Sequence, residues 1–218
     1  MRFATGEVAS TIDPDGASVG GGRIGVVVLA AGASRRLPGP KQMLRFRGVT
    51  LLRHAAQTAV AAGSGPVVVV LGAASTAKQL RFELVDLDVR IAENARWKEG
   101  MSSSIRAGLD ALEQAEATEA VLIMTCDQPH VTADLLKQLV ATYREKRPAA
   151  VACAYAGTVG VPALFDRSLF AELHALEHDQ GAKRILERHL HVIGRIPFEQ
   201  GAVDIDTPED VGKLSGEH

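Results

Sequence analysis

The stretch VVVLAAGASRRLPGPKQML, residues 26–44, passes from strand-forming residues through small residues into a cluster of positive charge. Its first part predicts a buried β-strand, and its second part predicts a loop, Ala30 to Lys41, that also carries Arg35 and Arg36. Glycine permits a tight turn and exposes backbone N–H groups, which form an anion-binding cradle when cationic side chains accompany them. We expect a phosphate group here, and a solvated surface loop is the alternative.

The glycine spacing excludes two common phosphate motifs. A Walker A loop requires G-x-x-x-x-G-K-[ST], whereas Gly32 and Gly39 are seven residues apart and Gln42 stands where Ser or Thr should follow the lysine. The dinucleotide-binding glycine pattern should follow the first strand, but the glycines at 20–22 precede it. The sequence therefore argues against a P-loop kinase.

Composition restricts the class of protein. The chain has 218 residues, 46% of them hydrophobic, and a formal net charge of −2, which suits one sizeable α/β core or two small ones and provides no basic field for nucleic acid. No apolar run reaches the ~20 residues that span a membrane. We expect a flexible extension over residues 1–23 and a single domain over residues 24–218. Cys126 and Cys153 lie in apolar runs, which indicates buried, reduced thiols and a cytoplasmic protein.

Apolar β-branched runs alternate with amphipathic segments along the chain. This alternation predicts an α/β fold with three layers, a Rossmann-like, mostly parallel sheet with helices on both faces. Strands are expected at 24–30, 66–72, 89–94, 120–127, 149–156 and 191–198, with a less regular region at 157–165. Helices are expected at 51–62, 75–84, 133 onward, 168–176, 182–190 and 208 onward, and after a Gly and Ser loop within 97–115.

Two segments carry acidic residues that could bind a metal ion. Asp127 ends the strand at 120–127, and the carboxyl ends of parallel strands carry the ligand site in open α/β sheets. A carboxylate that faces a cationic phosphate loop suits a Mg²⁺ ion bridging protein and phosphates, and a helix cap or turn acid is the alternative. Strand alternation in VDIDTPED would put Asp204 and Asp206 on one face, where Asp206 is the stronger candidate for a second ligand or else a surface acid.

Other catalytic patterns are weak. His174 and His178 are one helical turn apart, with His189 and His191 downstream, but no cysteine or carboxylate completes a zinc-ligand spacing. No serine stands in a G-x-S-x-G elbow, and the serines at 102–104 are expected to cap a helix or contact a ligand.

Several segments resemble one enzyme family. The segment LAAGASRRLPGPKQML resembles the signature L-A-A-G-x-S-x-R-[ML]-G-x-x-K of nucleotidyltransferases with a nucleotide-diphospho-sugar transferase-like fold. The segments WKEGMSSSIRAGL, CDQPHV, GVPALFDRSLFAEL, DQGAKRIL and DIDTPEDV resemble further blocks of the molybdenum cofactor cytidylyltransferases and their relatives within the MobA-like superfamily. The resemblance extends from about residue 24 to residue 214.

The resemblance implies a set of site residues. The backbone of Ala30, Ala31, Gly32 and Ala33 would contact the base and phosphates, Arg36 and Lys41 would neutralise the triphosphate, Gly100 and Ser104 would lie against the base or ribose, and Asp127 and Asp206 would bind Mg²⁺.

The resemblance also implies an activity. This would be CMP transfer from CTP to the phosphate of a molybdopterin-type acceptor with release of pyrophosphate, and a molybdenum hydroxylase or its accessory protein could receive the product. The alternatives are a guanylyltransferase that uses GTP, a sugar-phosphate nucleotidyltransferase, and a non-catalytic nucleotide- or cofactor-binding accessory protein.

Three positions depart from the family pattern. Pro38 and His178 stand where glycine is usual, and Val161 replaces a polar residue.

Overall fold

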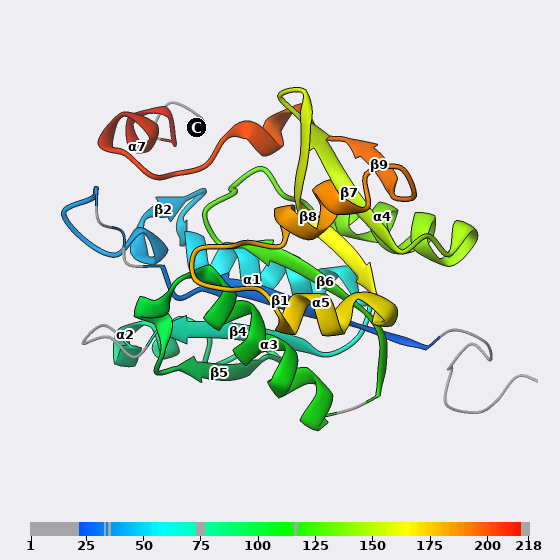
Figure 1. Cartoon of the computed structure of the whole chain (residues 1–218). Coiled ribbons are helices and arrows are strands. Elements are labelled where there is room, and N and C mark those ends of the chain that lie inside the picture. Colours follow the sequence, from blue (N-terminus) through cyan, green and yellow to red (C-terminus); the bar gives the residue numbers. More distant parts are fainter. Residues whose placement is uncertain (1–21, 33, 35, 73–76, 116, 215–218) are drawn as a thin grey trace, which may run out of the picture.

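The computed structural model describes residues 22–32, 34, 36–72, 77–115 and 117–214, so the expected extension of residues 1–23 lies almost entirely outside this part of the chain. Within it, seven strands form one sheet in the order β5-β4-β1-β6-β8-β7-β9 (Figure 1). Their bounds are β1 Arg23–Ala30, β4 Val67–Gly72, β5 Arg90–Asn94, β6 Thr118–Thr125, β7 Ala150–Tyr155, β8 Thr158–Asp166 and β9 Gly194–Pro197. A small hairpin of β2 Arg45–Phe46 and β3 Val49–Thr50 is separate from this sheet.

The central strand β1 pairs in parallel with β4 on one side and with β6 on the other. In this register Val28 lies between Val69 and Met124. β5 pairs in parallel with β4, and β9 pairs in parallel with β7. Among the described strands of this sheet, β8 runs antiparallel to its neighbours β6 and β7. The chain proceeds from β1 outward to β4 and β5 and returns to β6, so the strand order reverses between β1 and β6. Such a reversal is where open α/β sheets bind ligands.

Helices cover both faces of the sheet, which confirms the predicted three-layer fold (Figure 1). One face carries α1 Leu51–Ala62, α2 Ala77–Phe82 and α4 Ala133–Lys146, and the other carries α3 Met101–Ala115, α5 Phe170–His174 and α6 Lys183–Arg188. Side chains of β1 alternate between the two cores, since Val26 and Val28 lie in one and Val27 and Leu29 in the other.

Single turns of 3-10 helix are η1 Lys41–Met43, η2 Trp97–Glu99, η3 Arg167–Leu169 and η4 Glu199–Ala202. The last helix, α7 Pro208–Leu214, packs through Val211 against Phe46 and Ile205. This small apolar cluster fixes the C-terminal segment beside the hairpin of β2 and β3.

Helix ends follow the signals in the sequence. Thr50 accepts a hydrogen bond from the first turn of α1, and Gly63 ends this helix with a left-handed φ of 63°. Thr132 caps α4 in the same way. At α7 the Asp210 carboxylate accepts from the Thr207 backbone N–H at 3.0 Å and from its hydroxyl at 2.8 Å, which is a capping arrangement.

The region predicted to be less regular is the strand β8. A turn at Ala156 and Gly157, with φ values of 48° and 71°, joins β7 to β8. The pairing then passes from Cys153 opposite Gly160 to Ala152 opposite Ala163, so residues 161–162 form a bulge. The proline at 162 argues against a central strand in the sequence, but a bulge accommodates a residue that has no N–H to donate.

Other boundaries differ from the predictions. The serines at 102–104 belong to the first turn of α3 and not to a loop before it. The predicted helix over 168–176 is the turn η3 followed by the short helix α5. Residues 203–206 form no strand, so the alternation invoked for Asp204 and Asp206 does not apply, although Ile205 between them is fully buried.

Cys126 and Cys153 are buried free thiols, as predicted. No described helix is long and apolar enough to cross a membrane.

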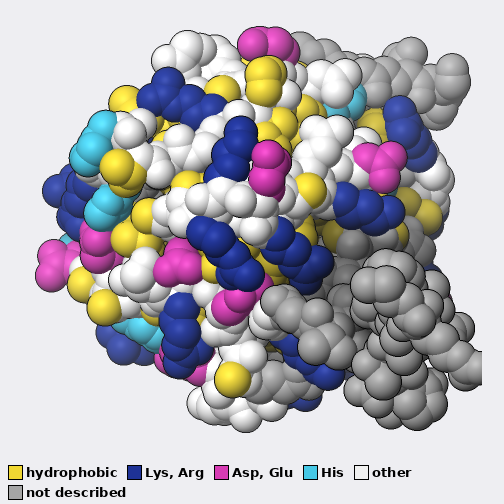
Figure 2. All heavy atoms as spheres, turned by 90° about the vertical axis from the view of Figure 1, so that its right-hand side faces the viewer, with side chains coloured by type: hydrophobic (Ala, Val, Ile, Leu, Met, Phe, Trp, Pro, Cys, Tyr) yellow, Lys and Arg dark blue, Asp and Glu magenta, His cyan; other side chains and the backbone are white. Residues whose placement is uncertain are grey.

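Figure 2 shows the face at the amino-terminal edge of the sheet, where Lys and Arg side chains intermingle with Asp and Glu. The ion pair between Arg147 and Glu119, 2.7 Å, lies at the beginning of β6 on that edge.

Candidate active site

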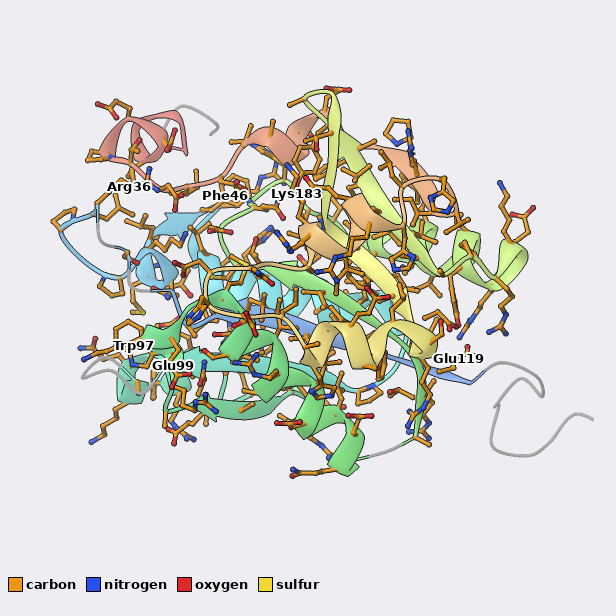
Figure 3. The ribbon with its side chains drawn as sticks, viewed as in Figure 1. Arg36, Phe46, Trp97, Glu99, Glu119 and Lys183 are labelled. Carbon is orange, nitrogen blue, oxygen red and sulfur yellow. The ribbon has the colours of Figure 1, made fainter. Side chains whose placement is uncertain are left out.

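The loop after β1 and the residues after β6 meet where the strand order reverses. Lys41 directs its ammonium group to the Asp127 carboxylate, two residues beyond β6. The same ammonium group donates to Asp206 Oδ1 at 2.6 Å, and Arg36 Nη2 lies 3.3 Å from Asp206 Oδ2. Figure 3 labels Arg36 at this carboxyl edge, close to the C-terminal helix. These four side chains, which come from three distant parts of the sequence, are termed the ionic cluster below.

Lys41 and Asp127 are the inner members of the ionic cluster. Their side chains are 13% and 15% exposed, whereas that of Arg36 is 69% exposed. Burial disfavours the charged form of Lys41, but the carboxylates of Asp127 and Asp206 outweigh burial and raise the pKa of the lysine. The lysine therefore keeps its positive charge at physiological pH.

The carboxylates of Asp127 and Asp206 both contact the ammonium group of Lys41. Two carboxylates that contact the same cation are also placed to bind one divalent metal ion. Carboxylate oxygens are the ligands that hard divalent cations prefer. Asp204 adds negative charge nearby: desolvation, followed by the charges of Asp127 and Asp206, raises its pKa to about 6 although its side chain is exposed. Three carboxylates close together favour a cation at this point.

The loop that precedes Lys41 is held by the side chain of Gln42. The Gln42 amide is buried, and its Nε2 donates to the carbonyl oxygens of Ala30 at 2.8 Å and Gly32 at 2.9 Å. Ser34 has a left-handed φ of 48°, and its Oγ accepts from the Lys41 backbone N–H at 2.7 Å. Ala33 and Arg35 lie outside the described residues. The loop therefore has a defined conformation on both sides of these positions.

The C-terminal segment carries Asp206 to the site through backbone contacts. The Ile205 N–H donates to the Asp127 carbonyl at 3.0 Å. The buried amide of Gln128 donates to the carbonyls of Gly201 at 3.0 Å and Val161 at 3.2 Å. Val161 departs from the family pattern in its side chain, but Gln128 bonds its backbone carbonyl, which any residue supplies.

The beginning of α3 forms a second part of the same edge. Asn94 ends β5, is buried, and donates through Nδ2 to the hydroxyls of Ser103 at 2.8 Å and Ser104 at 3.0 Å. Gly100 has a φ of 110°, and a Cβ atom there would collide with the carbonyl oxygen of His178. Gly100 thus permits close packing between two backbone segments, whatever further contact it makes with a ligand.

The backbone conformation at His178 is one that glycine adopts more easily, which accounts for the usual glycine at this position. Its φ is 48°, in the left-handed region that favours glycine. Its carbonyl accepts a hydrogen bond from the Ser102 N–H at 3.1 Å. The departure therefore retains the backbone conformation at the cost of some strain.

Trp97 connects the two parts of the edge. A Cβ atom on Gly72, the last residue of β4, would lie 3.1 Å from the Ala31 carbonyl oxygen and 3.2 Å from Trp97 Cγ. The indole therefore packs beside the first loop, and Figure 3 labels Trp97 and Glu99 at the same edge as Arg36. Trp97 and the three buried amides of Gln42, Asn94 and Gln128 were not predicted from the sequence.

The histidines do not come together. α5 ends at His174, so His174 and His178 do not share a helix. Outside the ionic cluster, His174 lies between two acids of α3, with Nε2 at 3.1 Å from Glu113 and Nδ1 at 3.9 Å from Asp110. Its two ring nitrogens face different carboxylates, which is the arrangement of an ion-pair bridge.

The chain is similar to known proteins over most of its length. Residues 26–192 match the MobA-like NTP transferase domain family. Nicotine blue oxidoreductase of Paenarthrobacter nicotinovorans is 34% identical over 197 residues, which cover 86% of this chain and 94% of that protein. Purine catabolism protein PucB of Bacillus subtilis is 28% identical over 199 residues, which cover 84% of this chain and 92% of PucB.

Solved structures are similar over nearly the whole chain. Rv0371c of Mycobacterium tuberculosis H37Rv has a TM-score of 0.75 and 29% identity, and the match covers 90% of this chain and all of Rv0371c. A structure of Rv0371c in complex with manganese has a TM-score of 0.70 and 28% identity, with 89% of this chain and 98% of that chain covered.

The mostly parallel sheet and these similarities define the class of nucleotidyltransferases with a nucleotide-diphospho-sugar transferase-like fold. The chain belongs to the family of MobA-like NTP transferase domains.

Proposed function

We propose that the protein is a Mg²⁺-dependent cytidylyltransferase that transfers CMP from CTP to the phosphate of a molybdopterin-type acceptor. The blocks EGMSSSIRAGL and DQGAKRIL support this branch of the family. The observation that carries the proposal is the convergence of Lys41, Asp127 and Asp206 on one point at the reversal of the sheet.

The proposed reaction requires positioning and charge neutralisation more than proton transfer. A phosphate oxygen of the acceptor attacks the α-phosphorus of CTP, the bond from this phosphorus to the oxygen that bridges to the β-phosphate breaks, and pyrophosphate leaves. The acceptor is already an anion at neutral pH, so no general base is needed. Arg36 and Lys41 supply positive charge for the triphosphate.

Asp127 and Asp206 would hold the divalent cation, and the manganese complex of Rv0371c supports a divalent cation in this family. When bound, such a cation neutralises phosphate charge and polarises the phosphoryl group. The Lys41 ammonium group interacts with the same two carboxylates, so this lysine and a metal ion compete for them. The beginning of α3, with Gly100, Ser104 and the neighbouring Trp97, would receive the nucleoside.

The test is pyrophosphate release from CTP and, in parallel, from GTP, with molybdopterin as acceptor and with or without Mg²⁺. One relative is named for a redox reaction, so the assay must detect pyrophosphate, which oxidoreduction does not release. Release that requires acceptor, CTP and Mg²⁺ supports the proposal. Release from GTP alone would identify a guanylyltransferase, and nucleotide binding without release under any condition would identify an accessory protein.

A further inference from the structure

Buried amide side chains gather at one edge of the sheet. In the described part of the chain the buried Asn and Gln residues are Gln42, Asn94 and Gln128, and each lies at or beyond the carboxyl end of a strand. Each donates two hydrogen bonds to groups on strands, loops or helix ends around the candidate site. Burying an amide is costly unless it is bonded, so these side chains act as fixed connectors.

Gln42 is the connector that contacts the predicted phosphate loop. Its Nε2 spans the carbonyls of Ala30 and Gly32, and Ser34 Oγ lies 3.5 Å from its Oε1. Ser34 in turn accepts the Lys41 N–H. One buried side chain thus links the end of β1, the glycine of the loop and the residue that bonds the backbone of the catalytic lysine candidate.

The direction of these bonds determines what the loop presents to a ligand. Carbonyl oxygens carry partial negative charge and would repel a triphosphate if they turned toward it. The Gln42 amide holds the oxygens of Ala30 and Gly32 on the protein side, while Lys41 and Arg36 provide the positive charge. Without this amide the peptide group of Gly32 could rotate and point its carbonyl oxygen toward the ligand, since glycine tolerates backbone conformations with either sign of φ.

We infer that Gln42 is a positioning residue for triphosphate binding, which it supports by keeping two carbonyl oxygens away from the phosphates. This inference rests on the proposed function, because it assumes that a nucleoside triphosphate binds this loop. Its effect depends on phosphate charge and not on the nucleobase, so the loss of affinity in a variant grows with the number of phosphates.

The experiment measures the Kd of CTP, CDP and CMP by calorimetry without metal for Gln42→Met, which keeps side-chain length and removes both donors. We expect the Kd of CTP to rise roughly tenfold, as for loss of buried hydrogen-bond partners, and that of CMP to change by about twofold or less. Gln57→Met is the matched control, because Gln57 is exposed on α1. Thermal unfolding of each variant reports whether the fold is retained.

The outcomes separate the two proposals. Equal losses for CTP and CMP, or no loss, in a folded Gln42→Met protein would overturn the positioning role. If wild-type protein binds none of the three nucleotides, the proposed function fails first. If Gln42→Met does not fold, Gln42→Asn serves instead, since it keeps an amide that is one methylene too short to reach both carbonyls.

Discussion

The two parts of the carboxyl edge are held together by different forces. The ionic cluster consists of charged side chains that meet from distant segments, with Lys41 between Asp127 and Asp206. The beginning of α3 is held by uncharged contacts, namely the packing of Gly100 on His178 and the bonds of Asn94. Substitutions in the first part should therefore change binding and chemistry with the fold retained, and substitutions in the second part should change the stability of the fold.

The largest effect is expected for Asp127→Asn. The change keeps side-chain size but removes one of the two metal-binding carboxylates, so turnover with Mg²⁺ should fall by roughly 10³-fold. Lys41 retains its partner Asp206, and the melting temperature should change little. Steady-state pyrophosphate release and a thermal scan check both parts. Turnover at the wild-type rate would remove Asp127 from the metal site.

Lys41→Met should have opposite effects on chemistry and on metal binding. Turnover should fall on the order of 100-fold, because a positive charge that stabilises the transition state is lost. The affinity for Mn²⁺ without nucleotide should rise, because the ammonium group no longer competes for Asp127 and Asp206. Titration followed by electron paramagnetic resonance measures free Mn²⁺.

Lys137→Met on α4 is the matched control for Lys41→Met, since this exposed lysine lies 3.6 Å from Asp134 and away from the ionic cluster. It should leave both turnover and Mn²⁺ affinity unchanged. Weaker Mn²⁺ binding by Lys41→Met than by the wild-type protein would contradict competition for a shared position.

Gly100→Ala tests the second part of the edge. The added Cβ would collide with the His178 carbonyl at a φ of 110°, so the free energy of unfolding should fall by roughly 1–3 kcal/mol. Urea denaturation measures the change. Gly212→Ala in α7 is the control, because its Cβ would meet no atom within 4 Å and alanine favours a helix. Equal stability of Gly100→Ala and wild type would mean that the close packing is not required.

The smallest expected effect is a change in how the free energy of unfolding depends on pH in an Asp204→Asn variant. Its pKa of about 6 lies above the value of ~3.9 in an unfolded chain, so the stability that it contributes is complete below pH ~4 and is lost as the pH rises through about 6. Asp204→Asn stays neutral and should lose no stability from this site over that range. Because the side chain is exposed, we expect a difference of ~1 kcal/mol or less between the pH slopes.

Urea denaturation between pH 4 and pH 7.5 compares the Asp204→Asn variant with the wild-type protein. A wild-type pH slope equal to that of the variant would show that the carboxylate is not perturbed by its neighbours.

The regular parts of the fold could be predicted because they follow from local patterns. The strand at 24–30 is a continuous apolar run, and the helix at 51–62 has a cap at each end. β8 was not predicted because Pro162 argues against a strand, and only the bulge opposite β7 makes it compatible with the sheet. That bulge depends on pairing with a neighbour and leaves no local signal.

The meeting of Lys41 with Asp127 could also be predicted, since charged residues after strands must meet at the carboxyl edge of a parallel sheet. Asp206 was predicted from a strand that the structure does not contain, and the contact of the Ile205 N–H with the Asp127 carbonyl brings it to the cluster. The contacts of Gln42, Asn94 and Gln128 could not, because an amide carries no charge and its partners are backbone or hydroxyl groups that only the tertiary structure brings close. For Gln42, its place directly after Lys41 in the loop was a signal in the sequence that this side chain could contact the site.

We propose that a nucleoside triphosphate and a divalent cation bind together at the ionic cluster. The most direct measurement is thermal stabilisation by CTP, GTP, ATP and UTP, each with and without Mg²⁺, for wild type and Asp127→Asn. Ligand at a hundred times its Kd should stabilise the native protein by roughly 2.7 kcal/mol. We expect a Mg²⁺-dependent shift, largest with CTP and lost in Asp127→Asn. An equal shift in the variant, or no shift with any nucleotide, would contradict this proposal.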